Sequence, residues 1–285
     1  MKTHVRSPQG KEVIIGDNLS MVLIGERIHP FGKGPIKDAL KSGDLRPLRE
    51  EALHQVEAGA DLLMVSVNAF GIDEWVVLPR AAEEIIKIVD VPLCLESRNP
   101  LALEETLKLD CGKPIISSVT GEDRVLEAIL PLVKKYDTGV VALASDGAGI
   151  PKEPSKRVAI ISRIIERAQK AGIAIEDILV DCVAESSAVN DRATMITLET
   201  MERVKRELGV NLVLGASNVS FGLPNRGIVN AVFLSFAIRA GLSCAIVNAA
   251  KMKPYIMAAD LLMGRDPGAR GYTTYCRKSK SVSPH

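Results

Sequence analysis

Short apolar runs alternate with longer amphipathic stretches along almost the whole chain. Eight of the runs are four to six residues long and consist largely of β-branched and other aliphatic side chains. Nearly continuous apolar character over so short a length is typical of parallel strands that are covered on both faces. The eight predicted strands are Met21–Gly25, Leu62–Val67, Val91–Leu95, Pro114–Ser118, Gly139–Leu143, Ile178–Asp181, Leu212–Gly215 and Cys244–Val247.

The stretches between these runs have the hydrophobic periodicity of helices. In the clearest one, Ser155–Ala171, apolar side chains recur about every 3.6 residues. Ser155 can cap its start and Gly172 its end. Within Asn225–Ala240, the apolar stretch Ile228–Ile238 is expected to face the core, with a subunit interface as the alternative. The remaining predicted helices are Leu45–Ala58, Trp75–Val89, Leu101–Leu109, Asp123–Tyr136, Ala193–Leu208 and Lys253–Met263.

Eight consecutive strand–helix units predict a single closed (β/α)8 TIM barrel, which about 250 residues routinely build as one domain. A doubly wound sheet usually has about five or six strands and would leave two units over. We expect one domain over residues 1–285, with the barrel core at about 18–266. Ser7–Asp17, with its Pro-Gln-Gly turn, predicts a short N-terminal hairpin that closes the barrel floor. The polar tail, residues 277–285, is expected to be disordered.

Composition and charge argue against several classes of function. Lys and Arg number 36 against 35 Asp and Glu, and this net charge of +1 gives no basic excess for nucleic-acid binding. No apolar run approaches the roughly 20 residues that span a bilayer, and the first residues lack the apolar segment of a signal peptide. Five scattered cysteines without a CxxC pair indicate reduced thiols and a cytoplasmic protein. The four histidines form no spaced cluster, so no metal site is expected.

Polar side chains stand where the predicted strands end, which is where barrel enzymes carry their active sites. Glu96 and Asp181 emerge from apolar strands, and burying such groups without partners costs about 1–3 kcal/mol each. A polar ligand that completes their hydrogen bonds would explain both. Ser117, Ser118 and Ser145 are explained equally well by pairing with one another and capping the next helices.

The residue types at these strand ends narrow the class of ligand. No lysine ends a strand, as a Schiff-base aldolase would need, and no Ser–His or Cys–His couple or phosphate-binding GxxxxGK[ST] loop is present. Carboxylates and amides dominate instead. Carboxylates aimed at adjacent N–H donors suit a flat, amide-rich heterocycle such as guanine or pterin.

Two of the strand-end segments resemble a known family. GERIHPFGKGPIKDAL (Gly25–Leu40) and ASNVSFGLPNR (Ala216–Arg226) are similar to the strand-one and strand-seven segments of pterin-binding methyltransferases. These include methyltetrahydrofolate:corrinoid/iron–sulfur protein methyltransferase and the folate domain of cobalamin-dependent methionine synthase. The resemblance runs from about Val13 to Asp266. Asn218 and Phe221 stand where dihydropteroate synthases carry a lysine-containing loop, which argues against that branch.

The resemblance implies roles for individual residues. Asn218 matches the asparagine that contacts the methyl-bearing nitrogen of the folate, and Asp181 matches the aspartate that binds the pterin ring. Glu96 stands where the family has aspartate, and Ser117 where asparagine is usual. Polar family positions are replaced at Met64 and Ser66. The predicted site is catalytic Asn218, with substrate binding by Glu96, Ser117, Asp181, Gly215 and Arg226 and no metal ligand.

The activity that the resemblance implies is methyl transfer between methyltetrahydrofolate and the cobalt of a corrinoid carried by a partner protein. Methylation of tetrahydrofolate in a demethylase pathway is the alternative direction, and a homodimer is the expected assembly. A side-chain amide is far too weak an acid to protonate the folate, so Asn218 is assigned a polarising role. Two other functions stay open: a non-catalytic barrel that binds folate or a corrinoid protein, and a same-scaffold enzyme for another heterocycle.

Overall fold

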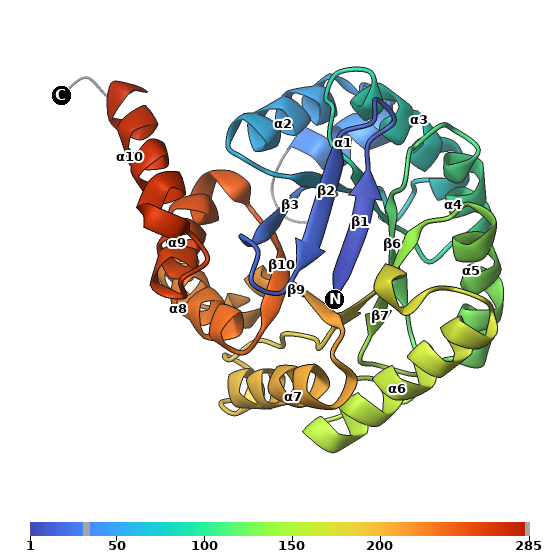
Figure 1. Cartoon of the computed structure of the whole chain (residues 1–285). Coiled ribbons are helices and arrows are strands. Elements are labelled where there is room, and N and C mark those ends of the chain that lie inside the picture. Colours follow the sequence, from blue (N-terminus) through green and yellow to red (C-terminus); the bar gives the residue numbers. More distant parts are fainter. Residues whose placement is uncertain (31–34, 283–285) are drawn as a thin grey trace.

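A closed barrel of parallel strands forms the centre of the molecule (Figure 1). The computed structural model describes residues 1–30 and 35–282, and in this part eight strands follow one another around the barrel in chain order, with the last beside the first. All eight predicted runs are strands of this barrel. They are β3 (Val22–Ile28), β4 (Leu62–Ser66), β5 (Leu93–Glu96), β6 (Ile115–Val119), β7 (Gly139–Leu143), β8 (Ile178–Asp181), β9 (Asn211–Gly215) and β10 (Leu242–Val247).

Helices surround the strands, and each predicted helix is present with its ends shifted by at most four residues. Gly209 ends α7 in the left-handed conformation, with φ 66°, a position that favours glycine. The helices at the predicted places are α2 (Arg46–Glu57), α3 (Glu74–Ile86), α4 (Pro100–Leu107), α5 (Asp123–Lys135), α6 (Pro154–Lys170), α7 (Ala193–Leu208), α8 (Arg226–Arg239) and α9 (Ala249–Leu262).

Two helices were not predicted. The first, α1 (Pro35–Ser42), is only about two turns long and buries Ile36, Ala39 and Leu40 before Gly43 turns the chain toward α2. The second, α10 (Arg270–Val282), packs against α9 and projects from the barrel (Figure 1). The tail that was expected to be disordered from residue 277 is helical as far as Val282 in this structure. Residues 283–285 lie outside the described part.

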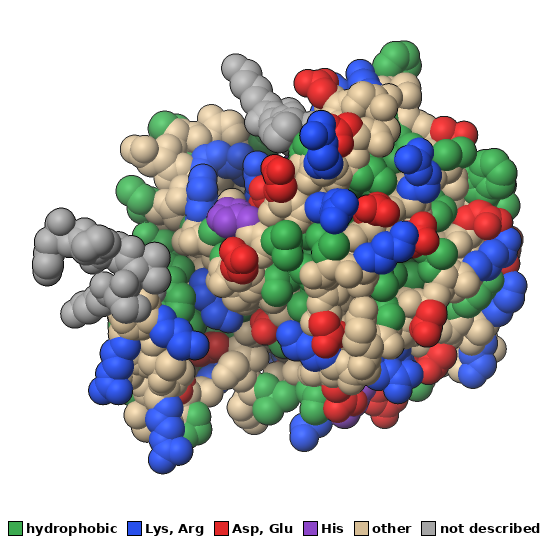
Figure 2. Space-filling view, turned by 90° about the horizontal axis from the view of Figure 1, so that it is seen from above, with side chains coloured by type: hydrophobic (Ala, Val, Ile, Leu, Met, Phe, Trp, Pro, Cys, Tyr) green, Lys and Arg blue, Asp and Glu red, His purple; other side chains and the backbone are tan. Residues whose placement is uncertain are grey.

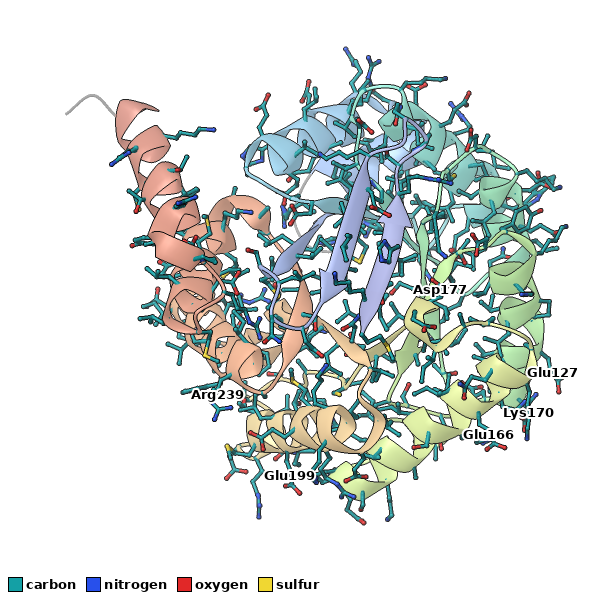
Figure 3. All side chains as sticks on the ribbon, viewed as in Figure 1. Glu127, Glu166, Lys170, Asp177, Glu199 and Arg239 are labelled. Atoms are coloured by element: carbon teal, nitrogen blue, oxygen red, sulfur yellow. The ribbon has the colours of Figure 1, made fainter. Side chains whose placement is uncertain are left out.

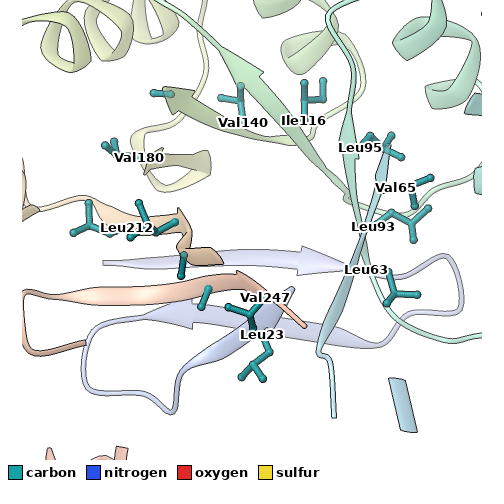
Figure 4. Packing of buried hydrophobic residues seen from close by; sticks show 14 of the residues in the cluster. Leu23, Leu63, Val65, Leu93, Leu95, Ile116, Val140, Val180, Leu212 and Val247 are labelled. Atoms are coloured by element: carbon teal, nitrogen blue, oxygen red, sulfur yellow. The ribbon is translucent and has the colours of Figure 1, made fainter. Parts of the chain in front are cut away.

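The strands divide their side chains between two apolar layers. Leu23, Leu63 and Val140 point outward and pack under the helices (Figure 4). Their neighbours along the chain, such as Val22 and Leu62, point inward and fill the barrel interior. This two-residue alternation is intrinsic to the strand backbone. The interior is therefore a packed apolar plug, and any ligand must bind at an end of the barrel.

The predicted N-terminal hairpin is present and closes one end. It consists of β1 (Lys2–Arg6) and β2 (Glu12–Gly16), and so begins earlier than expected. Val5 and Ile15 are fully buried in the interior cluster. At Gly112 (φ 71°) a Cβ atom would lie 2.3 Å from the carbonyl oxygen of Arg6, so only glycine allows β1 to approach so closely. The hairpin covers the amino ends of the strands and leaves the carboxyl ends open.

The outer surface is polar and of mixed charge. Figure 2 shows basic and acidic side chains interspersed over one face, without a continuous stripe of one sign. On the outer helices the labelled side chains point away from the barrel (Figure 3), and Glu166 and Lys170 of α6 form an ion pair at 2.6 Å. Among residues 1–30 and 35–282, no helix combines the length and the apolar composition that crossing a bilayer requires.

Candidate functional site at the carboxyl ends of the strands

Polar side chains form the last inward-facing layer of the barrel. Each stands two residues beyond an apolar interior residue, so the same alternation that buries Ile24 or Leu179 points the next inward residue into the mouth. An apolar base with a polar rim therefore follows from strand geometry. The polar or glycine positions of this layer are Glu26, Ser66, Glu96, Ser117, Asp181, Gly215 and Asn248.

Asp181 is the most deeply placed carboxylate of this layer, 8% exposed at the end of β8. Its Oδ1 accepts a hydrogen bond from the N–H of Val183 at 2.7 Å, and its Oδ2 accepts one from Gly215 at 3.3 Å. Burial raises the pKa of Asp181 to about 6, although these two donors and the charge of Arg157 act in the opposite direction. Two predicted binding residues, Asp181 and Gly215, are thus in direct contact.

Glu96 lies between two serines on neighbouring strands. The parallel register pairs Ser66 of β4 with Glu96 of β5, and Glu96 with Ser117 of β6. Burial raises the pKa of Glu96, while the Ser66 hydroxyl and the charge of Arg98 lower it. Predicted binding residues Glu96 and Ser117 are therefore neighbours, and Ser66 belongs to the same group.

Glu26 of β3 brings a further carboxylate into the mouth. Its Oε1 accepts a hydrogen bond from the Ser217 hydroxyl at 2.7 Å. Burial raises its pKa, while Ser217, the charges of Arg27 and Arg226 and the backbone N–H of Asn248 lower it. The site predicted from the sequence does not include Glu26. The signal was its two-residue spacing from buried Ile24, which marks an inward-facing position.

Asn218 lies in a 3-10 turn, η2 (Ala216–Ser220), that directly follows β9. Its side chain is exposed at the mouth, and its Nδ2 lies 3.4 Å from where a Cβ of Gly215 would stand. Arg226, at the start of α8, donates from Nε to the Ser220 hydroxyl at 3.0 Å and from Nη2 to the Ser217 carbonyl at 2.7 Å. Arg226 therefore holds the turn that presents Asn218 and stands outside the inward-facing layer.

Other strand-end polar residues have structural partners. Ser97 donates to Glu74 at 2.6 Å and accepts from the N–H of Asn99 at 3.0 Å. Asp146 accepts from the N–H of Ala148 at 2.9 Å within a tight turn. These contacts stabilise loops and helix starts.

The mouth has properties that fit a flat polar ligand. The Oδ1 atom of Asn248 is buried without a hydrogen-bond partner among the described residues, at a cost of about 1–3 kcal/mol that a ligand donor would remove. Carboxylates from three separate strands offer acceptors around an apolar base. In the part of the chain that the structure describes, no three His, Cys, Asp or Glu side chains come together as a possible metal site.

The fold and the strand-end polar layer define a (β/α)8-barrel protein with a candidate ligand site at its mouth. The chain matches the family described as pterin binding enzyme over residues 35–248, and it belongs to this family. It is 31% identical, over 269 residues, to a methylcorrinoid:tetrahydrofolate methyltransferase of Eubacterium limosum. That match covers 91% of this chain and 97% of the relative.

Three further proteins are similar to this chain, one in sequence and two in fold. The chain is 30% identical to the methionine synthase of Mycobacterium leprae, in a match over 82% of this chain and 21% of that longer protein. Among solved structures, the dihydropteroate synthase of Xanthomonas albilineans superposes with a TM-score of 0.69 at 17% identity, covering 92% of this chain and 98% of that one. The dihydropteroate synthase of Thermus thermophilus gives 0.68 at 18% identity, covering 91% and 99%. At such identities these structures show the shared barrel fold.

Proposed function

We propose that this protein transfers a methyl group between methyltetrahydrofolate and the cobalt of a corrinoid held by a partner protein. The observation that carries the proposal is the contact of Asp181 with Gly215, next to the turn that presents Asn218. The carboxylate to which we assign ring binding and the amide to which we assign polarisation both lie next to Gly215. The Eubacterium limosum relative, matched over nearly its whole length, supports the same chemistry.

The pterin ring is held by acceptors that match its N–H groups. Asp181 and Glu96 point inward from β8 and β5, and each accepts hydrogen bonds in its ionised form. The Ser117 hydroxyl beside Glu96 adds a donor or acceptor. The apolar layer below them excludes water, which strengthens these hydrogen bonds.

The reaction needs positive charge to develop on the methyl-bearing nitrogen, because the nitrogen of a neutral tertiary amine is a very poor leaving group. Asn218 stabilises that charge by hydrogen bonding and supplies no proton. Glu26, whose pKa is raised by burial, holds a proton more readily than an exposed glutamate does. Its partner Ser217 is the residue before Asn218, so the two groups serve the same part of the mouth.

The partner protein docks on a rim of exposed apolar side chains around the mouth. Phe70 is 95% exposed and Val189 87% exposed, and both lie in loops that follow barrel strands. Such exposed apolar surface is typical of an interaction site. The rim is completed by Trp75, Leu101, Ile150 and Phe221, each in a strand–helix loop or the first turn of the next helix.

The finer properties are part of the same proposal. Methylation of tetrahydrofolate is the favoured direction, as the relative's name describes, with O-demethylation as the upstream pathway. The five cysteines are free thiols, which suits the cytoplasm.

We propose a homodimer through α8. Its inner face is core, as expected, but Ile228, Val232 and Phe236 form an exposed apolar stripe. Sedimentation of the wild type and of Phe236→Asp measures this assembly.

Two measurements test the proposal. Titration with methyltetrahydrofolate, followed by calorimetry and by fluorescence of the half-exposed Trp75, is expected to show binding. Incubation of tetrahydrofolate with a methylated corrinoid protein is expected to yield methyltetrahydrofolate. Folate binding without turnover would indicate a non-catalytic binding barrel. No binding at millimolar folate would indicate an enzyme for another heterocycle.

A further inference from the structure

Arg157 of α6 is a charged side chain with no exposure to solvent. Burying a guanidinium is costly unless its N–H groups find acceptors. Its Nε donates to the carbonyl of Pro151 at 2.7 Å, and its Nη1 donates to the carbonyls of Cys182 and Val183, both at 2.8 Å. Its Nη2 is paired with the carboxylate of Glu185. Three of these four partners lie in the loop that follows β8, directly after Asp181.

The loop that Arg157 holds has an unfavourable backbone conformation. Val183 has φ 62°, in the left-handed region that β-branched residues rarely adopt. This conformation turns the N–H of Val183 onto Oδ1 of Asp181 at 2.7 Å. The carbonyl of Val183 faces the other way, toward Arg157 and toward the Thr197 hydroxyl at 2.9 Å. One peptide segment thus connects the buried guanidinium to the carboxylate at the mouth.

The same loop reaches the segment that carries Asn218. The N–H of Ser187 donates to the carbonyl of Val219 at 2.9 Å, and the Ser186 hydroxyl donates to the carbonyl of Phe221 at 2.5 Å. Residues 182–187 therefore run from the Arg157 contacts to the turn after β9. Figure 1 shows α6 and α7, which flank this loop, side by side.

We propose that Arg157 is a positioning residue, which holds the Asp181 carboxylate in the orientation that binds the pterin. The inference rests on the proposed function insofar as the ligand is a folate. The charged and titratable groups around Asp181 are Arg157, its partner Glu185 and the Cys182 thiol, whose pKa is raised by burial and by Asp181. Arg157 acts through the loop and makes no contact with the reacting atoms.

Substitution of Arg157 tests the proposal against a matched control. Arg157→Lys keeps the positive charge, but a lysine ammonium lacks the planar set of N–H donors that reaches all four acceptors. The Kd for methyltetrahydrofolate is therefore expected to rise about tenfold. The kcat at saturating folate is expected to change far less. Arg265 is a second, largely buried arginine, which donates to the carbonyls of Leu242 and Ile238 at the opposite end of the barrel. Arg265→Lys is expected to lower Tm and to leave Kd at the wild-type value. Equal Kd for Arg157→Lys and wild type overturns the proposal.

A second variant separates positioning from general loss of structure. Glycine adopts positive φ without strain, so Val183→Gly no longer needs the contact that holds the loop in this conformation. In the Arg157→Lys background, Val183→Gly is expected to recover about threefold in folate affinity. A double variant that binds no better than Arg157→Lys overturns the positioning role.

A ligand-free readout distinguishes this inference from the proposed function. Carboxyl ¹³C NMR follows the Asp181 titration, assigned by its loss in Asp181→Asn. The charge of Arg157 and the N–H of Val183 both lower the pKa of Asp181. Arg157→Met removes the first and loosens the second, so the midpoint is expected to move up from about 6. If the midpoint moves up in Arg157→Met but the wild type binds no folate, the proposed function is wrong, and Arg157 still positions Asp181. Folate binding by wild type with an unmoved midpoint in Arg157→Met would overturn the inference alone.

Discussion

At the scale of single residues, burial opposes the charge of the carboxylates that face the mouth. Burial raises the pKa of Glu26, Glu96 and Asp181 in each case, although hydrogen-bond donors partly offset it. Partly buried carboxylates with raised pKa values are typical of functional sites. A ligand that donates hydrogen bonds to them offsets the free-energy cost of their burial. The mouth is therefore suited to a ligand that donates hydrogen bonds.

Three of the four positions that depart from the family pattern, Ser66, Glu96 and Ser117, are neighbours on adjacent strands. Glu96 is one methylene longer than the aspartate that the resemblance implies, and Ser117 is shorter than the asparagine. The register places Glu96 between Ser117 and the equally small Ser66. The longer side chain of Glu96 therefore lies between two small serine side chains on the neighbouring strands.

Folate affinity is expected to depend on pH through Asp181. The ionised carboxylate of Asp181 can accept hydrogen bonds from the pterin through both oxygens, and the protonated acid cannot. Protonation with a pKa of about 6 is therefore expected to weaken folate binding, so that Kd rises about tenfold from pH 8 to pH 5. Asp181→Asn is expected to bind about tenfold more weakly at pH 8 and to lose this part of the pH dependence. Calorimetric titration across the pH range measures both effects, with Asp146→Asn, altered in a loop turn, as the control. A pH profile in Asp181→Asn that matches wild type would contradict the role of Asp181.

Asn218→Ala is expected to lower the rate of methyl transfer by about 10²-fold, the effect of removing one transition-state hydrogen-bond donor. Folate affinity is expected to change much less, because Asp181 and Glu96 still hold the ring. Stopped-flow kinetics at saturating folate measures the rate, and calorimetry measures the affinity. Turnover near the wild-type value would show that Asn218 does not polarise the reacting nitrogen.

At the scale of elements, the two ends of the barrel have different tasks. The hairpin β1–β2 seals the amino ends with apolar side chains, and Asn211 at the start of β9 ties it down by donating to the Thr3 hydroxyl and the Ile15 carbonyl, both at 3.0 Å. The carboxyl ends carry the polar layer and the loops. Stability and ligand binding therefore depend on opposite ends of the same strands.

Loss of the contact between hairpin and barrel is expected to affect stability alone. Asn211→Ala leaves a buried carbonyl and hydroxyl without their donor, so the free energy of unfolding is expected to fall by about 1–3 kcal/mol. The Kd for folate is expected to stay at the wild-type value. Urea denaturation and folate titration measure the two quantities, and Asn190→Ala, in an exposed loop, serves as the control. A weakened Kd in folded Asn211→Ala would show that the floor and the mouth are coupled.

At the scale of the whole molecule, the proposed methyl transfer requires a second protein to reach the mouth. The apolar rim surrounds that mouth and includes some of the most exposed large hydrophobic side chains of the described chain. In the proposed reaction, docking there would bring the partner's corrinoid over the folate, above a barrel whose interior is packed with apolar side chains.

Polar substitution on the rim is expected to impair use of the protein-bound corrinoid alone. The double variant Phe70→Ser, Val189→Ser is expected to raise the KM for the corrinoid protein about tenfold, since each truncation removes apolar contact at the interface. Turnover with free methylcobalamin and the Kd for folate are expected to remain unchanged. Leu262→Ser, at a similarly exposed side chain (85%) at the end of α9, is the control. A KM that does not respond would place the docking surface elsewhere.

The sequence by itself determined the barrel, because each strand is a short apolar run and each helix has its own period, and both patterns are local. It also located Asp181, Glu96 and Ser117 at the mouth, since a strand's carboxyl end can be read directly from the chain. The sequence analysis did not predict α10, which packs against α9.

Tertiary structure alone decided how the mouth is assembled. The Ser217 hydroxyl donates to Glu26, 191 positions away in the chain. Arg157, which lies in α6, donates to the loop that follows Asp181. A charged residue in a helix normally faces solvent, so the sequence gives no sign that Arg157 is buried. Long-range pairing and burial arise only when the barrel closes, which is why the strand ends were predictable and their partners were not.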